Sequence, residues 1–96
     1  METIYYKAYK RVMINRELNL EEKMMLNILF TIDEEVGAVC AYPYEYWKRI
    51  LSCSKSKVKK TIKSLEDKGL IVCEINENPD EANEYYITKR ALVFTD

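Results

Sequence analysis

Histidine is absent from this 96-residue chain, and glycine occurs only twice. Without histidine, a serine–histidine–aspartate triad and other histidine-based acid–base chemistry are excluded. The two glycines, Gly37 and Gly69, stand far apart and cannot build a phosphate-binding loop. The carboxylates cluster where surfaces and helix ends are expected, so solvation explains them. We therefore expect no enzymatic activity and no cofactor.

Cysteine is scarce, and its pattern is not that of a metal site. The three cysteines, Cys40, Cys53 and Cys73, form no CxxC pair and have no histidine to complete a tetrahedral set. We expect no metal and no disulfide, with Cys53 and Cys73 buried as small apolar groups.

Long apolar runs are also missing. No stretch of twenty apolar residues exists to span a membrane, and the N-terminus METIYYKAYKRV lacks the apolar centre of a signal peptide. Proline and glycine are too few for long linkers. We expect one domain over residues 1–96, located in the cytoplasm and without a membrane partner.

Charge alternates along the chain, although the net charge is only −1. Residues 36–73 carry eight bases and three acids, whereas residues 74–96 carry six acids and two bases. A local basic surface can therefore coexist with a nearly neutral total.

Residues 54–68 have the pattern of an amphipathic helix. Ser54 is a good N-cap, and Gly69 suits the position just after the helix. Val58, Ile62 and Leu65 follow at spacings of four and three, which places them on one buried stripe. Five lysines lie on or beside the opposite face. Any single lysine is most simply a solvated residue, but five together suit the major groove of DNA.

A longer helix is predicted at 19–36. Asn19 and Glu22 have the spacing of a capping box, and the main apolar face contains Met24, Met25, Ile28, Leu29 and Ile32. Leu26 and Phe30 form a second stripe. A helix that is apolar on two sides needs a second cover, which either the extension at 1–18 or a second subunit could supply.

Shorter elements complete the chain. We expect a strand at 39–42, a helix at 43–51, a hairpin at 70–88 with a loop of about eight residues, and a tail at 89–96. In the extension, 4–7 is a candidate strand. Residues 8–14 are a candidate helical turn with Tyr9, Val12 and Met13 facing inward.

In this order of elements the chain resembles the winged helix-turn-helix domains of replication initiators and related regulators from plasmids and phages of Gram-positive bacteria. The resemblance lies in YYKAYKRVMINRELNLEEKMMLNIL (5–29) and CAYPYEYWKRILSCSKSKVKKTIKSLEDKGLI (40–71). It implies a mainly α fold with a small antiparallel β-hairpin as the wing, and 54–68 as the recognition helix. The DNA-facing residues it implies are Ser54, Lys55, Ser56, Lys57, Lys59, Lys60 and Lys63.

Two functions are consistent with these features. The first is a regulator of transcription or replication that binds double-stranded DNA through the lysine-rich helix. The alternative follows from the predicted wing, which carries Glu77, Asp80, Glu81 and Glu84 and no base. That wing could bind a basic host protein, making the chain a protein-binding module or a DNA-mimicking antagonist.

The extension and the tail carry surplus apolar and basic residues. Lys7, Lys10 and Arg11 could make accessory DNA contacts, or the segment could simply pack on the core or on a partner subunit. We expect a homodimer whose interface contains Tyr5, Tyr6, Tyr9, Leu26, Phe30, Leu92 and Phe94. The alternative is a closed monomer in which the extension covers Leu26 and Phe30.

Overall fold

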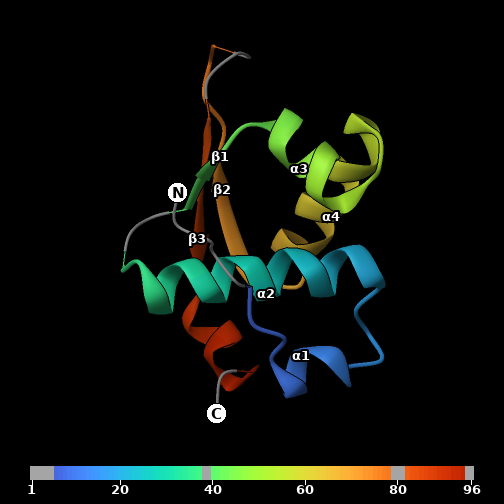
Figure 1. Cartoon of the computed structure of the whole chain (residues 1–96), viewed down its shortest axis with the longest axis vertical. Coiled ribbons are helices and arrows are strands. Elements are labelled where there is room, and N and C mark those ends of the chain that lie inside the picture. Colours follow the sequence, from blue (N-terminus) through green and yellow to red (C-terminus); the bar gives the residue numbers. More distant parts are fainter. Residues whose placement is uncertain (1–5, 38–39, 79–81, 95–96) are drawn as a thin grey trace.

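The computed structural model describes residues 6–37, 40–78 and 82–94. The elements are, in order, α1 (Lys10–Met13), α2 (Leu20–Glu35), β1 (Cys40–Tyr42), α3 (Tyr44–Leu51), α4 (Lys55–Asp67), β2 (Ile71–Glu74), β3 (Asn83–Ile87) and a 3₁₀ helix η1 (Lys89–Phe94). The protein is mostly helical with a small antiparallel sheet, and this arrangement is compatible with a winged-helix fold (Figure 1). Within the described ranges, no helix is long and apolar enough to cross a membrane.

The caps of α2 and α4 follow from local sequence. The Asn19 side chain accepts a hydrogen bond from the Glu22 amide, and the Glu22 side chain accepts one from the Asn19 amide. Ser54 caps α4 by accepting a hydrogen bond from the Lys57 amide at 3.1 Å. At the other end of α4, Gly69 has a φ of +73°, a left-handed conformation that glycine adopts without strain.

The three strands are ordered β1-β3-β2, with both pairs antiparallel. The hairpin of β2 and β3 agrees with the prediction; residues 75–82 separate its two strands, and 79–81 of them lie outside the described residues. The sequence also predicted the strand at β1, but not its pairing with the far side of β3. Tyr85 lies at the centre of the sheet, opposite Cys40 on β1 and Cys73 on β2.

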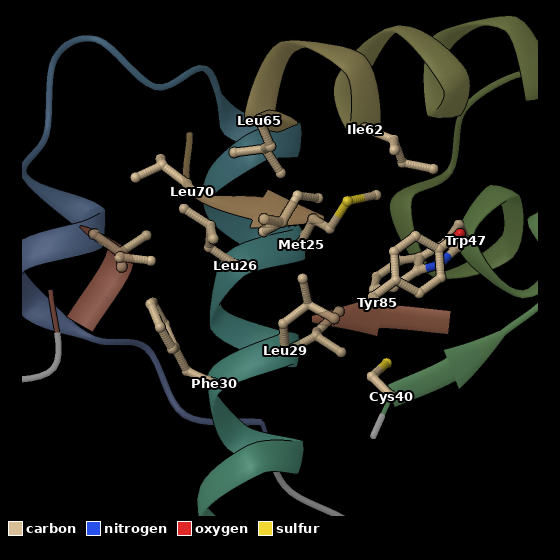
Figure 2. Packing of buried hydrophobic residues seen from close by; sticks show 14 of the residues in the cluster. Met25, Leu26, Leu29, Phe30, Cys40, Trp47, Ile62, Leu65, Leu70 and Tyr85 are labelled. Carbon is tan, nitrogen blue, oxygen red and sulfur yellow. The ribbon is translucent and has the colours of Figure 1, made fainter. Parts of the chain in front are cut away.

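The core forms around α2, which lies between the sheet and α4 on one side and α1 on the other (Figure 1). Figure 2 shows Met25 and Leu29 on the side of α2 that faces Trp47 and Tyr85. The Trp47 and Tyr85 rings pack edge to face with their centroids 5.5 Å apart. Burial of apolar side chains such as these is the dominant favourable contribution to folding.

The second apolar stripe of α2 is covered within the monomer. Leu26 and Phe30 are 0% and 2% exposed, and the Tyr9 ring packs edge to face on Phe30 with centroids 5.3 Å apart. The backbone amide of Tyr9 donates to the Asn27 side chain, and that of Lys7 donates to Thr31. Placing Leu26 and Phe30 in a dimer interface was therefore wrong, because the extension already buries them.

The other residues assigned to that interface have different environments. Tyr6 and Tyr9 are half-buried against the core, and Tyr6 also hydrogen-bonds the hydroxyl of Tyr46 on α3. Phe94 packs on the core too, whereas Leu92 is 48% exposed. Tyr5 lies outside the described residues. The homodimer itself stays a prediction.

The remaining corrections concern single residues. Residues 6 and 7 form no strand, and the rest of that predicted strand lies outside the described residues. Met13 is 41% exposed rather than inward, because α1 has only four residues and turns Val12 alone fully into the core. Cys53 and Cys73 are half-buried rather than buried, although both are free thiols that touch the core. Only Cys40 is buried, and burial raises its pKa to about 12.

Candidate nucleic-acid interface

Helix α4 presents its polar residues on one continuous surface. Val58, Ile62 and Leu65 are buried beneath the helix, together with Thr61. The structure places every residue of the DNA-facing set on the exposed side of α4 or at its cap: Ser54, Lys55, Ser56, Lys57, Lys59, Lys60 and Lys63. The sequence pattern thus located both the buried stripe and the basic surface.

Two of these lysines are held by an aromatic ring of α3. The ammonium groups of Lys55 and Lys59 lie 5.3 Å and 5.4 Å from the centroid of the Tyr44 ring. Partial burial is the main cause that raises the pKa of Tyr44. Cation–π contacts of this kind are worth about 0.5–1 kcal/mol at exposed sites. Tyr44 was missed from the sequence, because its contact depends on how α3 crosses α4.

A groove of about 460 Å³ separates α4 from the wing. Its α4 side carries Lys55, Lys59 and Lys63 with a single acid, Glu66, and its wing side carries Ile75 and Glu77. The two sides of the groove therefore have opposite charge. A phosphate backbone would be attracted to the α4 side and repelled by the wing side.

Most of the positive charge on α4 is not neutralised by the protein. Lys63 and Asp67 form an exposed pair at 3.6 Å, which contributes little to stability. Among the described residues, Lys57 and Lys60 have no ion-pair partner. These two exposed ammonium groups are free to bind an external anion.

A buried carboxylate fixes the C-terminal end of α4 to the start of α2. Glu22 is 2% exposed, and its Oε2 accepts hydrogen bonds from Lys68 Nζ at 2.6 Å and from Ser64 Oγ at 3.0 Å. Burial alone would raise the pKa of Glu22, but the hydrogen bonds from Lys68, the Asn19 amide and Ser64 outweigh it and lower the pKa. Glu22 was predicted as a helix cap; its contact with α4 was not.

The proposed accessory residues do not join this surface. Lys7 pairs with Glu34 at 3.1 Å and Glu35 at 2.5 Å, and these acids raise its pKa. Lys10 and Arg11 belong to α1, which lies on the other side of α2 from α4 (Figure 1). The structure therefore does not bring Lys7, Lys10 and Arg11 together with the lysines of α4.

The wing carries no base over its described residues, 71–78 and 82–87. Glu77 and Glu84 are exposed, whereas Asp80 and Glu81 lie outside the described residues. Glu84 stands directly opposite Glu74 in the β2–β3 ladder and accepts a hydrogen bond from the Tyr86 hydroxyl. That hydrogen bond, with partial burial, raises the pKa of Tyr86 to about 12.

Comparison with known proteins supports the fold. No protein-family model matches the chain, and no curated protein matches it. Among solved structures, the chain is similar to one described as the structure of a Rep–DNA complex, with a TM-score of 0.61 and 24% sequence identity. The match covers 90% of this chain and 75% of the other. At this identity the likeness establishes a shared fold.

Proposed function

We propose that this protein binds double-stranded DNA in replication control, with α4 entering the major groove as the recognition helix. The observation that carries the proposal is the set of five exposed lysines on α4, a helix that packs against α3. The similar structure is described as a Rep–DNA complex, which favours DNA over other polyanions and replication over transcription. A helix of this size fits the width of the major groove.

The lysines and serines of α4 take different roles in this proposal. Lys57 and Lys60 contact phosphates, because both are exposed and unpaired among the described residues. In this proposal Ser56, near the N-terminal end of the helix, reaches base edges. A lysine ammonium is a point charge that binds phosphate without fixed geometry. One copy should therefore discriminate only modestly between sequences.

The test is salt-dependent binding to a duplex of about 15 base pairs, which spans little more than one helical turn. The wild-type log–log slope should be about −3 to −5, corresponding to roughly three to six phosphate contacts. Lys60→Glu combined with Lys63→Glu should abolish binding while circular dichroism and the melting temperature show a folded chain.

The matched control is Lys10→Glu combined with Lys89→Glu, which changes the net charge equally on the other side of α2. This control should retain nearly all of the affinity on so short a duplex. Equal losses in the two double variants would mean that only net charge matters. Full affinity in the folded Lys60/Lys63 variant would remove α4 from the interface.

A second candidate function rests on the acidic wing. Its described part offers no base to a phosphate, and it exposes Glu74, Glu77 and Glu84. We propose as the alternative that the wing binds a basic protein, in place of DNA or beside it. A pull-down from host lysate with and without nuclease distinguishes the two functions. The alternative is supported if a protein partner is still captured after nuclease treatment and is lost in the variant that combines Glu74→Lys with Glu77→Lys.

A further inference from the structure

The exposed residues of α1 and η1, with Ile14 beside them, form what we term the α1–η1 surface. Its apolar members Met13, Ile14, Leu92 and Val93 are 41%, 66%, 48% and 56% exposed. Arg11 links the two elements by donating a hydrogen bond to the Val93 carbonyl at 3.2 Å. Exposed apolar residues gathered on two touching elements indicate a surface that binds another protein.

The same surface is basic. Lys10, Arg11, Lys89 and Arg90 are all exposed, and none of them forms an ion pair with another described residue. A two-fold dimer through this surface would place these four charges against their own copies. Such like-charge contact opposes pairing. The charge therefore favours an acidic partner over a symmetric one.

The wing provides an acidic surface with apolar residues of its own. Val72 and Ile75 are 48% and 68% exposed, and Glu74, Glu77 and Glu84 are exposed on the same hairpin. Glu74 and Glu84 are direct cross-strand partners, an arrangement of like charges that destabilises a hairpin. No described residue forms an ion pair with any of the three glutamates. A basic partner would relieve this repulsion.

We propose that copies of this chain associate head to tail, with the α1–η1 surface of one copy bound to the wing of the next. The two surfaces have opposite charge, and each also exposes apolar side chains. They also lie at opposite ends of the molecule, with α1 and η1 at one end of its long axis and the end of β2 and the start of β3 towards the other (Figure 1). One copy can therefore contact a neighbour at each end.

This association does not depend on DNA, so it is tested with the protein alone by sedimentation velocity over a range of concentrations. Two double variants each remove one surface: Glu74→Lys with Glu77→Lys reverses the wing, and Lys10→Glu with Lys89→Glu reverses the α1–η1 surface. Glu21→Lys with Glu45→Lys is the charge-matched control near α3 and α4. Circular dichroism confirms the fold of each variant.

Wild-type protein and the control should associate at low salt and dissociate near 1 M salt, where the screening length is about 3 Å. Each reversed variant alone should lose at least about tenfold in association constant. An equimolar mixture of the two should recover it, because each mutated surface then meets its complement.

Three results would overturn the proposal. Wild-type protein could remain monomeric at the highest concentration in low salt. The wing variant could associate as well as wild type, which would indicate a symmetric contact through α1 and η1. The mixture could associate as weakly as either variant alone, which would show that the two surfaces do not bind each other.

Discussion

The surface of α4 and the wing lie on either side of one groove, yet their exposed charges are of opposite sign. Helix α4 carries five exposed lysines, of which only Lys63 forms an ion pair with another described residue. The described wing carries exposed glutamates and no base. A net charge of −1 conceals both surfaces. The identity of a partner therefore depends on where charge is placed in the fold, and the total is uninformative.

The largest effect should come from detaching α4 from α2. Lys68→Ala leaves the Glu22 carboxylate buried without its cation, and we expect a loss of about 3 kcal/mol in the free energy of unfolding. Urea denaturation measures this loss. The control is Lys63→Ala, which removes an exposed pair and should cost less than about 0.5 kcal/mol. Equal losses in the two variants would show that the contact with Glu22 is not special.

The same contact should make the protein sensitive to acid. The pKa of Glu22 is lowered from its ordinary value of 4.5, so its stabilisation is complete above that pH. It is lost as the pH falls below 4.5 and through the lowered pKa of the folded state. Denaturation curves from pH 7 to pH 3 should show this decline. Glu22→Gln should start less stable and lose less in acid; parallel curves for the two proteins would contradict the assignment.

A smaller effect is expected from single lysines of α4. Lys57→Gln and Lys60→Gln should each weaken duplex binding and make the log–log salt slope shallower by about 0.9, as expected for one lost phosphate contact. Lys89→Gln is the control and should leave the slope of a short duplex unchanged. If the salt slope were unchanged in both lysine variants, the phosphates would contact another part of the molecule.

Reversing one charge on the wing should stabilise the fold. Glu74→Lys replaces a like-charge cross-strand pair with an attractive one opposite Glu84, and we expect a gain of about 0.2–1 kcal/mol. Thermal melting at low salt measures the gain, which high salt should reduce. Glu74→Gln should give an intermediate value. A lower melting temperature for both variants would mean that Glu74 has a favourable contact.

The smallest change is expected for DNA binding when the wing loop is neutralised. Changing Glu77, Asp80 and Glu81 to glutamine should leave duplex affinity unchanged or slightly higher, because it removes only like-charge repulsion of the DNA. The comparison between the two surfaces would fail if this variant bound DNA markedly less well, since the wing would then contribute directly to the complex.

The sequence was sufficient where the determinants are local. The capping residues Asn19 and Ser54 and the buried stripe of α4 depend on neighbours within a few positions, and the structure has them as expected. Position along one helix also determined which lysines are exposed. Local periodicity therefore predicted most of the candidate interface.

Contacts between distant segments were beyond this reasoning. Three contacts depend on how the elements cross in space. They are the pairing of β1 with β3, the contact of the Tyr44 ring with two lysines of α4, and the ion pair between Lys68 and Glu22. The cover over Leu26 and Phe30 illustrates the limit most clearly. The sequence showed that a cover was needed, but packing by the extension and pairing with a second copy satisfy the same apolar pattern.

The carboxylate of Glu22 has a consequence for how this protein can change over evolutionary time. One oxygen caps α2 through the Asn19 amide, and the other receives Ser64 and Lys68 from α4. Losing the acid alone removes a cap and the counter-ion of Lys68, whereas losing the lysine alone leaves a charge in the core. Positions 22, 64 and 68 should therefore covary among related sequences, with an apolar or neutral set replacing all three together, while the lysines of α4 drift independently.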